Sequence, residues 1–283
     1  MDKYICPKCR KQLIEDNVIR CFCSSCHSIF DKPEIGGTVW KALQAGMKSG
    51  HSEHIWKIGK WYEINGEKSN EKDFSASERV IDAMQDTPME VLAQVEVDGE
   101  HFVRKGDKGD KEYWQKMQVM NAWKWEKKYS VALAIFAAEL TLQNYVKKYP
   151  SGDLPHKAIE AAKKWLKSPI EKNQLAADAA GSEAWSAAEL AAKLTSVSSV
   201  RSVWSVMEKA AELALRSAGQ SAWSAAESDA LSAKAAAEAV VQSNNSAAQL
   251  SGPDGGEITQ KCEDWIQKHI AELEEIKHAE TII

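Results

Sequence analysis

The sequence lacks an apolar run of membrane length. Its best candidate, Val131 to Ala138, ends at the charged Glu139, whereas a membrane-spanning helix needs about 20 apolar residues. A secretory signal is missing as well, because Met1 to Tyr4 lead directly into a pair of cysteines. We therefore expect a soluble, cytoplasmic protein that has no membrane partner.

An excess of basic residues is also absent. The chain of 283 residues has 36 Lys and Arg against 41 Asp and Glu, a net charge of −5, and a broad nucleic-acid surface requires the opposite sign. The negative charge is concentrated at the end, where residues 251–283 hold eight Asp and Glu and three Lys. We expect this acidic segment to face a basic patch on a protein partner.

Sequence signatures of catalysis are missing too. The chain has neither a glycine loop of the phosphate-binding type nor a Gly-x-Ser-x-Gly elbow, so we expect that it is not an enzyme. One enzymatic alternative concerns residues 36–125. There, Asp73 to Ser77 is similar to the Ser-Thr-Ser strand of ADP-ribosyltransferases, and Glu96 would be the required glutamate. The simpler interpretation is that Ser75 or Ser77 caps a helix.

What the sequence does contain is two closely spaced cysteine pairs near its start. Cys6 and Cys9 form the first Cys-x-x-Cys pair, and Cys23 and Cys26 form the second. Two such pairs supply the tetrahedral sulfur ligands that zinc prefers, and four ligands leave no open position for catalysis. The sequence therefore predicts a zinc ribbon over residues 1–35, with one structural Zn²⁺ per chain that contributes folding energy.

Three further residues could be considered as metal ligands. Cys21 and His27 lie beside the second pair and could replace one of its members, although Cys23 and Cys26 restore the same spacing on both sides. Cys262 is remote in sequence, and we expect it to be a small buried apolar residue.

A mixed α/β domain is expected over residues 36–125. Alternating apolar residues predict strands over Ile55–Ile64, Met89–Val97 and Met117–Trp125, and a short helix over Ser77–Gln85. In the second strand Val91, Ala93, Val95 and Val97 share one face. In the third, Met117, Val119 and Trp123 share one face.

The pattern becomes helical over residues 126–250. Apolar residues recur at helical spacing from Val131 to Tyr145, and Tyr149-Pro150 ends this helix. A second helix is expected over Lys157–Lys167, with its apolar residues facing inward; these are Ile159, Ala162, Trp165 and Leu166.

A repeat follows these two helices. Trp185, Trp204 and Trp223 are 19 residues apart, which suits a helix of about 14 residues and a turn, and twice that spacing suits a helical hairpin. At twice that spacing, Gly181 to Glu189 is nearly restated as Gly219 to Glu227. We expect alanines at the helix contacts, one tryptophan per helix between the layers, and the two glycines at helix ends.

Residues 251–283 form the last predicted segment, a linker and an acidic amphipathic helix. Its stripe of Cys262, Ile266, His269, Leu273 and Ile276 is expected to pack on the helical bundle. The alternative is a dimer contact, so the chain could be a monomer or a homodimer. The predicted fold class is thus α+β and multi-domain: a zinc ribbon, a small mixed domain and an all-α repeat bundle rich in Ala and Trp.

The helical segment resembles the immunity-protein domain found near polymorphic-toxin loci. Residues Tyr145–Pro150 and Asp153–Leu166 resemble that family's Tyr-Pro, Asp, Arg-Pro-Arg and Ala-Ile-Glu-Ala-Ala-Arg-x-Trp run, and Ala-rich helices follow. Leu154 and His156 stand where the family has arginines, so the resemblance does not extend to those two positions. Parts of residues 56–97 resemble an uncharacterised domain that is fused to such arrays in phage and mobile-element proteins.

These resemblances imply a protein that neutralises a toxin by binding it. We therefore expect a non-enzymatic inhibitor of phage or mobile-element type, whose partner is a toxin or a nuclease-bearing defence complex. The alternative from another class is a nucleic-acid-associated regulator, in which Lys8, Arg10, Lys11 and Arg20 of the ribbon would contact phosphates.

Overall fold

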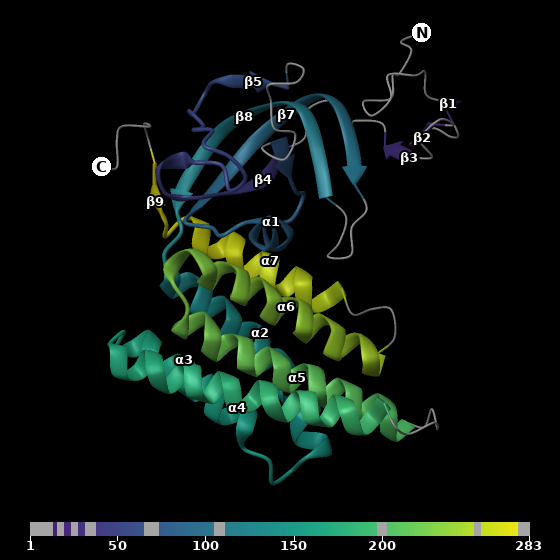
Figure 1. The fold of residues 1–283 in the computed structure, drawn as a ribbon, viewed down its shortest axis with the longest axis vertical. Coiled ribbons are helices and arrows are strands. Elements are labelled where there is room, and N and C mark those ends of the chain that lie inside the picture. The colour runs from purple at the N-terminus through teal and green to yellow at the C-terminus, as the bar shows by residue number, and fades with distance from the viewer. Residues whose placement is uncertain are drawn as a thin grey trace. The chain divides into compact units, whose positions relative to one another are not determined.

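The computed structural model describes residues 14–15, 20–23, 28–31, 38–64, 74–104, 111–196, 203–251 and 256–276. The chain divides into two compact units. The first takes in the described parts of Met1–Ala83, Val91–Lys124 and Glu275–Ile283, and the second those of Met84–Glu90 and Trp125–Glu274. Figure 1 shows strands in the first unit and helices in the second, so the α+β class is confirmed.

A small antiparallel sheet is described near the N-terminus. Its strands, in spatial order, are β1 (Ile14–Glu15), β2 (Arg20–Cys23) and β3 (Ser28–Asp31). Ile14 is paired with Phe22, and Cys23 with Ser28. Cys23, the first residue of the second Cys-x-x-Cys pair, is therefore the last residue of β2.

The main sheet of the first unit is antiparallel and is built on one long hairpin. Its central strands are β7 (Val91–Arg104) and β8 (Lys111–Lys124), flanked by β4 (Thr38–Leu43) and β5 (Trp61–Glu63). The short strands β6 (Ser75–Ala76) and β9 (Glu274–Glu275) also pair with β8. A 3-10 turn, η1 (Ala45–Met47), follows β4, and helix α1 (Val80–Asp86) precedes β7.

One face of this sheet carries the core of the first unit. The predicted alternation of β7 is confirmed, because Val91, Ala93, Val95 and Val97 are all buried in one cluster. The same cluster contains Met117 and Val119 of β8, together with Val39, Leu43, Met47, Trp56, Phe74, Ala76, Trp114 and Ala122. Side chains at alternate positions of neighbouring strands meet in this way because the strand period is two.

The predicted face of Trp123 is wrong, because β8 contains a bulge. Val95 is paired with Val119, but Ala93 is paired with Ala122, which leaves one extra residue in β8. The extra residue reverses the alternation. Ala122 therefore joins Val119 in the core, while Trp123 lies on the opposite face, where its ring is 6.1 Å from that of Trp40.

Two further predictions for this unit need correction. The strand expected over Ile55–Ile64 is reduced to β5, because Gly59 adopts a φ of +76° that interrupts extended backbone. The helix expected from Ser77 starts at Val80 instead. Neither candidate cap residue caps it: Ser75 lies in β6, and Ser77 exchanges backbone hydrogen bonds with Trp40.

The second unit is a bundle of long helices. In chain order they are α2 (Lys127–Lys148), α3 (Leu154–Lys167), α4 (Glu171–Ser196), α5 (Val203–Ala226), α6 (Asp229–Ser251) and α7 (Gly256–Ile270). Helix α5 contacts α2, α3, α4 and α6, and α7 packs on α2 and α6. The predicted ends of α2 and α3 agree with the structure to within about three residues, although Leu166 is 37% exposed and does not face inward.

Alanine dominates the bundle core, as the sequence predicted. Ala184, Ala188, Ala211, Ala218 and Ala222 are all buried to 1% exposure or less. Such short side chains let helix backbones approach closely. None of the described helices combines the length and the hydropathy that a membrane span requires.

The predicted repeat of short helices is wrong. Trp185 lies in α4, while Trp204 and Trp223 both lie in α5, so the 19-residue spacing is not one helix and a turn. The 38-residue spacing relates α4 and α5, two consecutive helices that contact each other, as expected for that spacing. Gly181 and Gly219 are in helix interiors and not at helix ends.

Candidate functional site

The predicted zinc ligands Cys6, Cys9 and Cys26 lie outside the described residues. Cys23 is the last residue of β2, and its backbone pairs with Ser28. The zinc ribbon, and the possible replacement of a ligand by Cys21 or His27, therefore stay predictions. Within the described parts of the chain, no three His, Cys, Asp or Glu side chains form a group that could hold a metal ion.

An aromatic cluster occupies the core of the first unit. The ring centroid of Trp56 is 4.9 Å from that of His54, 5.1 Å from that of Tyr62 and 5.4 Å from that of Phe74. The buried Lys41 donates a hydrogen bond to the backbone oxygen of Ser75 at 2.8 Å. Burial also raises the pKa of Tyr62 above its ordinary value, and the backbone of Lys57 opposes the rise. We interpret this cluster as packing that orders the loop before β5.

The residues of the enzymatic alternative lie on different strands. Ser75 in β6 is paired with Tyr113 of β8, whereas Glu96 in β7 is paired with Gln118 of β8. Strands β6 and β7 both pair with β8, and the β8 partners of Ser75 and Glu96, Tyr113 and Gln118, lie at different positions along it. The ADP-ribosyltransferase alternative stays a prediction, and a test for transfer from NAD would decide it.

In the second unit, α4 and α5 cross where each helix has a glycine. A Cβ atom at Gly181 would lie 3.1 Å from the backbone oxygen of Gly219, and one at Gly219 would lie 3.3 Å from the backbone oxygen of Gly181. Trp185 and Trp223 meet over this crossing, with ring centroids 5.2 Å apart. The absence of side chains at both glycines is what allows the close approach.

A buried carboxylate lies on α5 near this crossing. The side chain of Glu212 is 1% exposed, and its two oxygens accept hydrogen bonds from Lys209 and Arg216 at 2.9 Å each. The guanidinium carbon of Arg216 also lies 4.5 Å from the ring centroid of Trp185. The two cations offset the cost of burying the carboxylate, so this group is structural.

At one end of the bundle a hollow opens between α4 and α5. Its volume is 510 Å³, and its lining consists of Glu171, Gln174, Leu175, Asp178, Ala226 and Glu227. Three of these six residues are acidic, and the Leu175 side chain is 63% exposed. The hollow therefore combines negative charge with accessible apolar surface.

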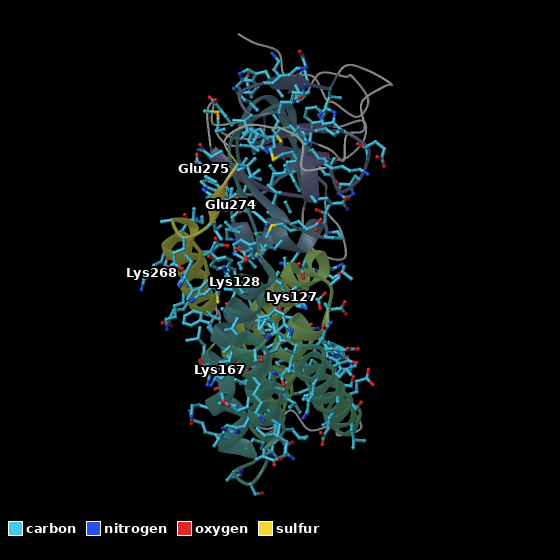
Figure 2. All side chains as sticks on the ribbon, turned by 90° about the vertical axis from the view of Figure 1, so that its left-hand side faces the viewer. Lys127, Lys128, Lys167, Lys268, Glu274 and Glu275 are labelled. Carbon is cyan, nitrogen blue, oxygen red and sulfur yellow. The ribbon has the colours of Figure 1, made fainter. Side chains whose placement is uncertain are left out.

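The walls of this hollow are held in place by two side chains that cap α5. Gln174 donates a hydrogen bond to the backbone oxygen of Ala226, and Lys127 donates one to that of Glu227. The last carbonyls of a helix lack partners within that helix, so such caps fix its end. Lys127, labelled at the start of α2 in Figure 2, also lies 4.5 Å from the Trp165 ring centroid. Burial lowers the pKa of Lys127, while Asp229 and Glu227 oppose this shift.

The first part of the C-terminal stripe packs on the bundle as predicted. The predicted helix ends at Ile270, however, and Ile276 packs against the core cluster of the first unit. Cys262 and Ile266 are fully buried and Leu273 is 8% exposed, and Trp265 of α7 stacks on Phe136 of α2 at 6.4 Å. Burial raises the pKa of the Cys262 thiol to about 12, and Glu263 adds to the shift. Cys262 is thus the buried apolar residue that the sequence indicated.

Sequence reasoning missed the hollow. Glu171, Asp178 and Glu227 are spread over 57 positions of the chain, and no short motif connects them. The only available signal was the nearly repeated segment around Gly181 and Gly219, which could have indicated that α4 and α5 cross there. The hollow lies near that crossing, since its lining includes Asp178, three residues before Gly181, and Ala226, seven residues after Gly219.

Comparisons of the chain with protein-family models, with curated proteins and with solved structures found no match. The resemblance to immunity-protein domains therefore stays a prediction that depends on residues 129–170 and the Ala-rich helices after them.

Proposed function

We propose that this chain is a non-enzymatic binding protein of phage or mobile-element type, which neutralises a toxin or a defence complex by direct contact. The observation that carries the proposal is the acidic hollow beside the exposed Leu175. A concave surface with both charge and apolar area can bind and orient a protein segment. The resemblance of the helical segment to immunity-protein domains supports the same function.

The bundle behind the hollow is suited to presenting a fixed surface. Buried hydroxyl groups connect its helices: Ser243 of α6 donates to the backbone oxygen of Ala137 in α2 at 2.7 Å and lies 2.7 Å from the hydroxyl of Ser217 in α5. Ser246 of α6 donates to the backbone oxygen of Ala210 in α5, also at 2.7 Å. A surface ordered before binding loses less conformational entropy when a partner docks, which favours affinity.

The test is native mass spectrometry of the full chain purified gently from a bacterial host that expresses candidate toxins and defence complexes. We expect a stoichiometric complex with one of them and loss of that partner's activity on addition of the purified chain. A complex that leaves the partner's activity unchanged would contradict neutralisation. Absence of a complex with every candidate would contradict the proposal as a whole.

The same sample distinguishes the nucleic-acid alternative. Zinc bound at one ion per chain, with co-purifying nucleic acid and no protein, would favour the regulator. In that case affinity should fall steeply with salt, because displaced counterions drive phosphate binding. Substitution of Lys8 and Arg10 by Gln should then flatten the salt dependence, whereas it should leave a protein complex formed through the second unit intact.

A further inference from the structure

Helix α4 has two distinct faces over residues 171–190. Its buried face consists of Ala177, Gly181, Ala184 and Ala188, which are turned toward the bundle. On the opposite side, small or apolar residues recur four, three, four and four positions apart, and all are exposed: Leu175, Ala179, Ser182, Ser186 and Leu190. With 3.6 residues per turn, these five residues form one stripe, which we call the outer face of α4.

Two large apolar side chains mark the ends of the outer face. Leu175 is 63% exposed and Leu190 is 60% exposed. They are 15 residues apart in sequence, which corresponds to about 22 Å along a helix. A single exposed leucine is ordinary. Two leucines joined by alanine and serine on one stripe form a surface on which another helix can pack at close range.

The charges beside the outer face restrict what can bind there. Residues 171–190 contain four acidic residues and one lysine, a sum of −3. Glu171, Asp178 and Glu189 follow one edge of the stripe, and Glu183 lies near the other. A second copy of this chain would bring the same negative charges against these, and like charges oppose association. Charge complementarity therefore selects a basic partner.

The hollow continues the outer face at its N-terminal end. Leu175 and Asp178 belong to both, and Glu227 contributes a carboxylate from beyond α5. A volume of 510 Å³ accommodates one long side chain, and the carboxylates suit an ammonium or guanidinium group. The apolar stem of a lysine or arginine would pack against Leu175 while its charged end reaches the acidic residues.

We infer that the outer face of α4 binds a basic amphipathic helix of a protein partner, and that the hollow receives one lysine or arginine of that helix. The inference rests on the proposed function and specifies its partner chemistry. Apolar residues of the partner helix pack between Leu175 and Leu190, and its flanking basic residues pair with Glu171, Asp178 and Glu189.

The test measures binding of a fluorescent peptide to the full chain by anisotropy. The probe is a helical peptide of about five turns with a leucine stripe flanked by lysines and arginines. One control peptide has the same composition in scrambled order, and another keeps the leucines but has glutamates in place of the basic residues. We expect the amphipathic basic peptide to bind about tenfold more tightly than either control peptide.

Variants locate the site. Leu175→Gln with Leu190→Gln should weaken peptide binding by about tenfold, a free-energy loss of about 1.4 kcal/mol. Leu231→Gln is the matched control, because Leu231 of α6 is 41% exposed and lies outside the outer face. Glu171→Gln with Asp178→Asn should weaken binding most at low salt. Circular dichroism establishes that each variant retains its helices.

Each outcome is decisive for the surface. Equal binding of the ordered and scrambled peptides, or full binding by the double leucine variant, overturns the inference. The inference is also overturned if the double leucine variant binds a native toxin or defence complex as tightly as the unaltered chain does. The proposed function would stand in that case. If instead the peptide result is as expected but no toxin or defence complex is neutralised, the surface stands and the proposed function fails.

Discussion

A methyl group added at Gly181 tests the close crossing of α4 and α5. In an unobstructed helix interior, replacing glycine by alanine stabilises a protein by about 1 kcal/mol. At Gly181 the new Cβ would lie 2.7 Å from Cδ1 and 2.9 Å from Nε1 of Trp223, and 3.1 Å from the Gly219 backbone oxygen. These separations are too short for carbon, so Trp223 or α5 must move.

The cost of that movement decides the sign of the effect. The Trp223 ring is in contact with that of Trp185, at 5.2 Å between centroids, and the Gly219 oxygen belongs to a helix backbone. Overpacking of this kind costs about 1–3 kcal/mol, which exceeds the propensity gain of about 1 kcal/mol. We therefore expect Gly181→Ala to lower the free energy of unfolding by about 1 kcal/mol.

Gly219→Ala is the matched control. Its Cβ would lie 3.3 Å from the Gly181 oxygen and 3.5 Å from Ala184 Cβ, so small shifts suffice and the propensity gain should nearly compensate. Urea unfolding followed by far-UV circular dichroism measures both variants. Equal stability of Gly181→Ala and Gly219→Ala would show that the crossing accepts the added methyl group without overpacking. In a Trp223→Leu background the penalty at Gly181 should shrink, and a double-mutant cycle measures that coupling.

Three further predictions concern other parts of the chain. Metal analysis should find one zinc per chain, lost in Cys26→Ser but retained in Cys21→Ser; retention in both variants would contradict the ligand assignment. Cys262 should not react with a thiol reagent until the chain is unfolded. Burial raises the pKa of the Cys262 thiol from 9.0 to about 12. As pH rises, the thiol therefore loses its proton in the unfolded chain before it does so in the folded chain. Urea unfolding should therefore show that stability falls as pH rises above about 9 and that Cys262→Ala reduces this fall; an unchanged slope would contradict the assignment. Arg216→Ala should cost about 3 kcal/mol in urea unfolding, because Glu212 would keep a buried charge with one partner fewer; a loss below about 1 kcal/mol would show that Lys209 alone suffices.

The sequence predicted those features of the fold that depend on local periodicity. The β7 alternation and the stripe from Val131 to Tyr145 were correct because each follows one period and each faces a single core. Trp123 was placed wrongly because a bulge adds one residue to β8. No local sequence pattern predicts a bulge, because a bulge depends on the register with the neighbouring strand.

The candidate site was harder to predict than the fold. The outer face of α4 is built of alanine, serine and two leucines, a composition that also suits a buried helix. Whether such a stripe is inside or outside depends on which of the two faces of α4 meets α5. The crossing at Gly181 determines which face of α4 is buried, because only the face that carries the glycine can approach the backbone of Gly219.

The near-identity of Gly181–Glu189 and Gly219–Glu227 has a physical explanation in this crossing. Side chains of a helix lean toward its N-terminus, so Trp185 and Trp223, each four residues after its glycine, lean back over the same point. The same short sequence on both helices thus places one tryptophan ring over the crossing from each helix. The surroundings differ, however, because Arg216 stacks on Trp185, whereas Trp223 lies one turn before the hollow. Displacing Trp223 should therefore disturb the hollow, and with it partner binding, more than displacing Trp185.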